Sequence, residues 1–465
     1  MSSLLASLQN AGDSLSVFEN AIGVIQGNVT NASTPGYVNR TPTLTTDPLG
    51  NVAAGVTQSS RNQFAEQAVW QQNDLLGFSS QQATNLSSLQ SQFDVTGKSG
   101  IPNALSSLYS AFSSWSANTS DPGTRNQVLT AAGQVVQAFN QVSTSVQASV
   151  TQANQQISSS VAQINQLTSR IVAINTQIRS GDQENPGLQT QLYNALQQLS
   201  NFSTISVHLE LDGTATVLMN MQVPLAIGET QTPLQVSYSP APGSTAMPDA
   251  RITVPSGQDV TSSAAAGGQL GGLLQVRNQT LPSLIGDASQ QGSLNQLAQG
   301  VADRVNALLA SGQTSSGASG VPLFTYNAAS PTGIAGSLSV NSAVGASDLA
   351  AIQPGPPVVA NGIAAKLAKL QNPTNSADMI NGMNYTAFYS NMASNLGTQA
   401  ANASQSKDSQ TDLLSQAENV RSQDSGVSLD QQATQLLQFQ QAYAASSKLI
   451  TVINEITNDL MNVIH

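Results

Sequence analysis

The sequence has 465 residues, a net charge of −11, no cysteine, and only 8% charged residues. The shortage of Lys and Arg excludes the clustered basic face that nucleic-acid binding needs, and the lack of Cys excludes disulfides and cysteine zinc sites. No stretch approaches the ~18 uninterrupted apolar residues of a membrane span, so we expect neither a nucleic-acid partner nor membrane insertion.

The N-terminal segment has the pattern of a coiled-coil helix that ends near Val29. Its apolar residues alternate at intervals of four and three, which places one seam on one helix face. The seam consists of Leu4, Leu8, Ala11, Leu15, Phe18, Ile22, Ile25 and Val29. The first basic residue is Arg40, and no charged start precedes an apolar block. We therefore expect no cleaved signal peptide, so that an extracellular location would need another export route.

A turn motif follows this helix. The run Asn28-Val-Thr-Asn-Ala-Ser-Thr-Pro-Gly-Tyr37 brings Asn, Pro and Gly together. Its last four residues fit a type II turn, because Pro35 fixes φ at the second position and Gly36 supplies a positive φ at the third. The next segment, from about 38 to 57, is broken by prolines and predicts a strand-like linker.

Helical periodicity dominates the middle of the chain. We expect helices over about 62–93 and 102–115, a very long one over 126–178, and another that ends near 201. At 1.5 Å per residue the long helix would extend roughly 75 Å, which predicts a rod and not a sphere. Helices resume over about 273–309 with a bend near Pro282, then over 361–369 and 384–420.

Between these helical parts the apolar period changes to two, which predicts a small β insertion rich in turns. Asp212-Gly213 separates the first two strands. A three-residue loop would pair Leu211 with Ala215 and align the two apolar sets on one face, with Gly213 in a left-handed conformation. Short β pieces are also expected over 234–238, 251–254 and 338–340.

The last helix begins after a break at residues 424–430, where Ser428 and Gln431 have the spacing of a capping box. Its seam repeats the pattern of the first helix, with Ser446 and Thr457 at two of its positions. The apolar members are Leu436, Phe439, Tyr443, Ile450, Ile453, Leu460 and Ile464. The two seams could pair within one molecule or contact neighbouring copies. Further apolar residues beside both seams favour more than one neighbour.

The order of these elements predicts the architecture. We expect a mainly α, elongated, multi-domain rod with both termini at one end. Residues 1–45 plus 425–465 would form a terminal coiled-coil assembly domain, 46–204 plus 268–424 a helical-bundle rod domain, and 205–267 a small β-rich outer domain. Nothing in the pattern indicates an enzyme. The histidines are only His208 and His465, and the glycines at 267–272 lack the residues of a phosphate loop, so we expect no catalytic, cofactor or metal site.

Four motifs resemble the bacterial flagellar axial proteins, which comprise rod, hook and hook-associated proteins. Residues 28–37 match the signature Asn-x-x-Asn-x-x-Thr-Pro-Gly-Tyr, whose counterparts here are Asn28, Asn31, Thr34, Pro35, Gly36 and Tyr37. Ser425-Gly-Val-Ser-Leu-Asp430 with Leu436-Leu-Gln-Phe-Gln-Gln-Ala-Tyr443 is similar to the C-terminal run of hook-associated junction subunits. Residues 384–397, and 268–274 followed by 297–303, are similar to further helices of the same family.

The resemblance implies a structural subunit at the junction of hook and filament, required for filament assembly. It would be exported through the flagellar type III channel and form a ring of copies, with the two seams as the assembly interface. The implied partners are further copies of itself, the hook protein, the next hook-associated junction protein and an export chaperone on the C-terminal helix. The alternatives are a hook or distal-rod subunit and, from other classes, a type III-secreted adhesin or effector, or a peptidoglycan hydrolase.

Overall fold

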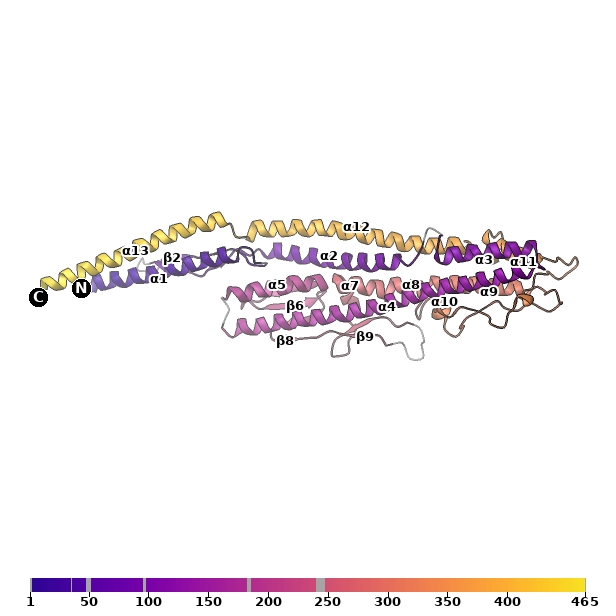
Figure 1. Ribbon diagram of the computed structural model, residues 1–465. Helices are drawn as coiled ribbons and strands as arrows, with labels where there is room; N and C mark the ends of the chain where they lie inside the picture. The colour runs from indigo at the N-terminus through magenta and orange to yellow at the C-terminus, as the bar shows by residue number, and fades with distance from the viewer. Residues whose placement is uncertain are drawn as a thin grey trace.

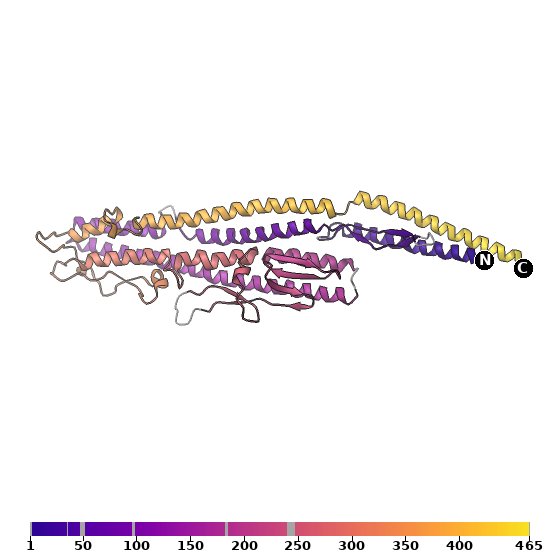
Figure 2. The ribbon, with the colours of Figure 1, turned by 180° about the vertical axis from the view of Figure 1, so that it is seen from behind.

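The computed structural model describes residues 2–34, 36–46, 52–94, 98–181, 185–239 and 247–464. It shows an elongated, mainly helical rod in which the N- and C-termini lie at the same end (Figure 1). Figure 2 shows the same arrangement from behind, with the terminal helices at one end and the sheet along the side of the rod. Both features agree with the architecture expected from the sequence. Among the described residues, no helix is long and apolar enough to cross a membrane.

The terminal end of the rod consists of two helices, α1 (Ser2–Asn31) and α13 (Leu429–Ile464), which pack side by side. The chain after α1 is extended, as the sequence predicted, but its strands pair with one another. It folds into an arm in which β1 (Arg40–Thr41) pairs with β4 (Gln58–Ser59), and β2 (Leu44–Thr46) pairs with β3 (Val52–Ala54). This arm lies along α1, so antiparallel pairing satisfies backbone groups that an open linker would leave to water.

The middle of the rod is a helical bundle. α4 (Pro122–Arg179) packs on α3 (Gly100–Ala117) and α5 (Pro186–Phe202), while α2 (Gln63–Gln90) packs along α12 (Tyr385–Ser425). With 58 residues, α4 extends about 87 Å, longer than predicted. Four of these helices begin at a side chain that accepts a hydrogen bond from the first turn, namely Asn62, Asp121, Asn185 and Asn384.

The long helix α4 serves two hydrophobic cores. Its first half, with Phe139 fully buried, packs in one core with residues of α2, α3, α9, α11 and α12. Its second half, from Ile157 to Ile178, packs in another core with α5, α7 and the strands. The apolar spacing that the sequence shows along α4 thus runs continuously through both cores.

The β insertion forms a four-stranded antiparallel sheet in the order β5-β6-β7-β8. Its strands are β5 (Ile205–Leu209), β6 (Ala215–Met219), β7 (Val223–Ile227) and β8 (Thr230–Gln231). Gly213 has φ +82°, as predicted, but Ala215 pairs with Leu209 and not with Leu211. The Glu210 backbone nitrogen closes the loop by donating to the Thr214 carbonyl at 2.9 Å, which leaves Leu211 exposed at the tip. The observed strand register differs from the predicted one by two residues, so the apolar side chains of both strands still lie on one face of the sheet.

Two further short strands, β9 (Gln235–Ser237) and β10 (Arg251–Thr253), pair at the positions that the sequence indicated. Because all these strands share a core with α4, α5 and α7, they pack against the bundle. The division into three domains stays a prediction.

The return path after the sheet differs from the expected single bent helix. α7 (Gly268–Gln275) continues through a π-helical turn (Val276–Thr280) into α8 (Leu281–Ile285), and α9 (Ser293–Ala310) follows after a break. The break lies at Gly286, with φ +85°, and not at Pro282, which fits the first turn of α8. The remaining elements are α6 (Thr261–Ala264), β11 (Phe324–Thr325), α10 (Ile334–Ser337), β12 (Ser339–Val340) and α11 (Gly362–Ala368).

Candidate assembly interface

The seam between α1 and α13 is formed within one chain. On α1 it buries Ala11 and Ile25, and on α13 it buries Ile453, which is 6% exposed. Phe18 and Phe439 meet across it with ring centroids 6.4 Å apart. Most of the other predicted seam residues are half-buried, namely Leu4, Leu8, Leu15, Ile22, Leu436 and Ile450.

Some predicted seam positions lie outside the contact. On α1, Ala21 and Asn28 are buried, whereas Val29 is 44% exposed. On α13, Tyr443 and Leu460 are 36% and 40% exposed. A straight helix has 3.6 residues per turn, so a strict seven-residue repeat drifts around its surface, and neighbouring positions take over at the ends of the seam. The side chain of Ile464 lies outside the described residues.

A buried polar cluster sits where the seam meets the arm. The Asn28 amide nitrogen donates to the Gln432 side-chain oxygen at 2.8 Å and to the Arg40 carbonyl at 2.7 Å. The Asn28 side-chain oxygen accepts from Tyr37 Oη at 2.9 Å and from the Arg40 backbone nitrogen at 3.1 Å. Asn28 and Gln432 are both fully buried. Every hydrogen-bonding position of the Asn28 amide is thus in use, and the cluster fixes α1, α13 and the arm relative to one another.

The signature residues form the turn that the sequence predicted. Gly36 has φ +73°, and the Tyr37 backbone nitrogen donates to the Thr34 carbonyl at 3.1 Å. Asn31 donates to the Gly27 carbonyl at 2.9 Å. Pro35, the second turn position, lies outside the described residues. Burial raises the pKa of the Tyr37 phenol, which therefore stays protonated and donates to Asn28.

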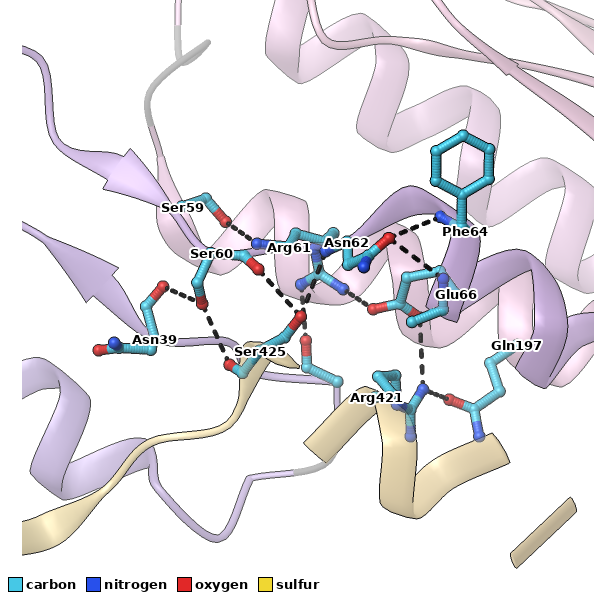
Figure 3. A network of polar contacts seen from close by, with 12 residues as sticks. Asn39, Ser59, Ser60, Arg61, Asn62, Phe64, Glu66, Gln197, Arg421 and Ser425 are labelled. Carbon is cyan, nitrogen blue, oxygen red and sulfur yellow. Dashed lines mark hydrogen bonds and ion pairs between the residues drawn. The ribbon is translucent and has the colours of Figure 1, made fainter. Parts of the chain in front are cut away.

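An ion-pair node connects this turn to the rod (Figure 3). Arg61 pairs with Glu66, whose side chain is only 2% exposed, and its Nη2 donates to the Gly36 carbonyl at 2.7 Å. The Arg61 guanidinium also stacks 3.7 Å from the ring centroid of Tyr193 on α5. Arg421 of α12 reaches Glu66 at 3.3 Å. One carboxylate therefore holds two guanidinium groups from different parts of the chain.

Burial lowers the pKa of the Arg61 guanidinium, and the Glu66 carboxylate opposes this shift. A guanidinium keeps its charge even so. Loss of either partner would leave a buried charge without compensation, so the node is a rigid connection between the signature turn, α2, α5 and α12.

Ser425 connects the end of α12 to the arm. Its carbonyl accepts from the Asn39 backbone nitrogen at 2.8 Å, and its hydroxyl donates to the Ser60 carbonyl at 2.9 Å (Figure 3). Asp424 accepts from the Asn62 side chain at 2.7 Å. The predicted capping box of α13 is present only in its serine half, since Ser428 Oγ accepts from the Gln431 nitrogen at 3.5 Å.

Apolar side chains of α13 beside the seam form a face that α1 leaves uncovered. Leu449, Val452 and Ile456 follow one another at helical spacing and are 52%, 38% and 44% exposed. The exposed apolar residues of α13 are Leu429, Leu437, Tyr443, Leu449, Val452, Ile456, Leu460 and Met461. Contiguous exposed apolar patches are typical of contact sites, whereas single exposed apolar residues are ordinary.

Sequence reasoning missed the node and the buried amides. Arg61, Glu66 and Arg421 are charged residues in a chain that has few, and this rarity is the one signal that could have singled them out. Nothing in the spacing indicated that Gln432 would pair with Asn28, because the two lie 404 residues apart.

His208 is exposed on β5, as expected, and His465 lies outside the described residues. Within the described ranges, no group of three or more His, Cys, Asp or Glu residues could hold a metal ion.

The model of the helical domain of the flagellar hook-associated protein FlgK matches residues 86–324, which is just over half of the chain. The chain belongs to the FlgK family of flagellar hook-associated proteins. Residues 421–463 also match the C-terminal model of the flagellar basal body rod proteins FlgEFG. The prediction of a flagellar axial protein is therefore confirmed, and the family consists of structural components of the flagellum.

Two relatives agree with this assignment. The flagellar hook-associated protein 1 of Bacillus subtilis (strain 168) is 24% identical over 99% of both chains. The structure of the flagellar hook junction protein FlgK from Burkholderia pseudomallei superposes with a TM-score of 0.67 at 17% identity, over 77% of this chain and 99% of that one. The expected mainly α, elongated fold is confirmed by this likeness.

Proposed function

We propose that this FlgK-family chain forms the junction between the flagellar hook and filament, as a ring of copies assembled through α1 and α13. The observation that carries the proposal is the uncovered apolar face of α13. Full burial of an aliphatic side chain is worth about 1.5–3 kcal/mol, and Leu449, Val452 and Ile456 are still 52%, 38% and 44% exposed, so a single chain leaves roughly half of that gain unrealised. Neighbouring copies that cover this face would realise it, and their contacts are repeated around a ring.

The structure supports separate roles for the terminal helix pair and for the node that joins it to the rod. The intramolecular seam of α1 and α13 provides a preformed building block, and the node at Arg61 and Glu66 sets its direction relative to the rod. Assembly would then use the outer faces of this helix pair. The seam residues that were predicted from the sequence would hold its two helices together. We assign residues 1–45 and 425–465 to this terminal domain, and 205–267 to a β-rich outer part.

The proposed partners are further copies of the chain, the hook protein on one side and the next hook-associated junction protein on the other. We also propose an export chaperone that covers α13 before assembly, because its apolar face would otherwise promote aggregation. The final location would be extracellular, after export without a cleaved signal peptide. The role is structural, with no enzymatic step.

The family match also separates this proposal from its nearest alternative. The C-terminal model is one of rod proteins, which would also suit a rod or hook subunit, but the model of the long helical domain is specific to FlgK. The helical domain therefore favours the junction over the hook or the distal rod.

Electron microscopy of a strain without this chain tests the function. We expect bare hooks and filament protein shed into the medium, restored by the wild-type chain. A chain that lacks residues 430–465 keeps the node but loses α13, and should fail to restore filaments although its middle part stays folded. Filaments attached to hooks in the deletion strain would contradict the proposal.

A further inference from the structure

A pocket of about 420 Å³ opens beside the signature turn, between α1 and the start of α5. Its lining residues come from three parts of the chain, namely Asn20, Gly23, Val24, Gly27, Asn31, Thr34, Tyr37, Arg40, Gly187 and Thr190. It lies on the block that we propose to assemble, so its occupant bears on how copies meet.

Glycines keep this pocket open. A Cβ placed on Gly23 would meet no heavy atom within 4 Å, and one on Gly27 would meet only the Tyr37 hydroxyl at 3.8 Å. The helix backbone of α1 is thus accessible to a bulky group from outside. Val24 and the Tyr37 ring supply apolar and aromatic surface around it. A flat aromatic side chain suits such a cavity, because the lining combines polar side chains with Val24, the Tyr37 ring and open space at the glycines.

An unpartnered aromatic side chain lies at the start of α2. Phe64 is 83% exposed, more than any other aromatic residue that the structure describes. Its backbone nitrogen donates to the Asn62 side chain at 3.0 Å, so its position is fixed by the cap of α2. Figure 3 shows its ring pointing away from the node into the surroundings. An exposed Phe held on a rigid helix start contributes nothing to this chain's own core.

We propose that Phe64 of one copy inserts into this pocket of the next copy. This inference rests on the proposed ring and names one contact within it. The pocket and Phe64 lie at the same level along the rod. Arg61, which is three residues before Phe64, donates to the carbonyl of Gly36, and Gly36 belongs to the turn that borders the pocket. Two different surfaces at one level give a heterologous contact, which closes into a ring by rotation.

The charges near the two surfaces are complementary. Arg40 lines the pocket and forms no ion pair within the described part of the chain. Asp424 accepts from Asn62, the cap residue two positions before Phe64, and it too has no ion pair among the described residues. In the proposed contact, the copy that supplies Phe64 also carries Asp424, and the copy that supplies the pocket carries Arg40. In a chain with 8% charged residues, such a match is specific.

The absence of natural cysteine permits a direct test by disulfide formation. Two variant chains, Phe64→Cys and Gly23→Cys, are produced together with wild-type chains in a strain that lacks the chromosomal copy. One of the two variants carries a tag that distinguishes it by size. Flagella are isolated and mildly oxidised. We expect mixed disulfide dimers at a yield at least fivefold above a control pair of Leu211→Cys with Gly23→Cys. Leu211 is equally accessible but lies at the hairpin tip.

A second measurement does not depend on thiols. We expect Phe64→Ser to reduce the fraction of cells with attached filaments at least tenfold, and Phe64→Leu to restore most of it, while both purified chains unfold at the wild-type temperature. Mixed dimers no more abundant than in the control pair, or full filament attachment with Phe64→Ser, would overturn the contact. If wild-type chains restore filaments in those same strains, the junction function stands although the contact fails.

Discussion

Asn28 on α1 and Gln432 on α13 form a buried hydrogen bond of 2.8 Å between residues 404 positions apart. This bond ties the first helix to the last at the point where both meet the arm. Neither side chain reaches solvent, so each amide depends on the other and on Asn39, whose side chain contacts both. The contact between α1, α13 and the arm is therefore held by uncharged groups that are insensitive to salt.

Replacement of Asn28 by Ala should loosen the terminal pair without affecting the bundle. It removes the donor to the Gln432 side-chain oxygen and to the Arg40 carbonyl, at a cost of about 1–3 kcal/mol for each acceptor left unpaired. We expect faster amide exchange over α1 and the first half of α13, and unchanged exchange in α4. Gln26→Ala, at an exposed position two residues earlier, is the control. Equal exchange in both variants would show that the cluster does not hold the helices.

Substitutions at two isoleucines on α13 should distinguish an effect on folding from an effect on assembly. Ile453 is 6% exposed in the seam, whereas Ile456, less than one turn later, is 44% exposed on the outer face. Ile456→Ser should change the stability of the purified chain by less than about 0.5 kcal/mol but reduce filament attachment, because its partner is another molecule. Ile453→Ala should cost about 2–4 kcal/mol within the helix pair itself.

Amide exchange over α13 in the purified chains and electron microscopy of the complemented strains check both variants. Normal filament attachment with Ile456→Ser would remove the outer face from the interface.

The parts of the molecule that have a periodic apolar pattern or a turn motif could be predicted from the sequence. Helices α1, α4 and α13 follow from apolar spacing alone, and the turn at Gly36 follows from the need for a positive φ. The arm and the node do not follow, because they depend on contacts between residues far apart, such as Ser60 with Ser425. The hairpin register was missed for a related reason, since slips by two residues preserve the apolar face and only the loop geometry decides between them.

Arg61→Met should destabilise the chain by about 3–5 kcal/mol, because it removes the closer of two guanidinium groups from a buried carboxylate. It also frees the Gly36 carbonyl and the face of Tyr193. The matched control is Arg179→Met, whose ion pair with Asp212 is exposed and should contribute less than about 1 kcal/mol. Urea unfolding of both variants gives the comparison, and similar midpoints would show that the node carries no stability.

Asp74 should make the stability of the rod depend on pH in an unusual direction. Burial raises the pKa of its carboxyl from 3.8 to about 6, although Thr204 and the Gly268 backbone nitrogen donate to it. The folded chain therefore binds this proton more tightly than the unfolded chain. The resulting stabilisation is complete below about pH 4 and is lost as the pH rises through about 6, by up to about 3 kcal/mol.

Asp74→Asn removes this titration and keeps an oxygen that accepts from Thr204. Compared with the wild-type chain, the variant should be more stable at pH 7.5, and the difference should disappear toward pH 4. Urea unfolding of both chains at several pH values between 4 and 8 measures this difference directly. A difference that is constant over the range, or that grows toward acid pH, would show that the Asp74 carboxylate is charged in the folded rod at pH 5, with Thr204 and Gly268 outweighing its burial.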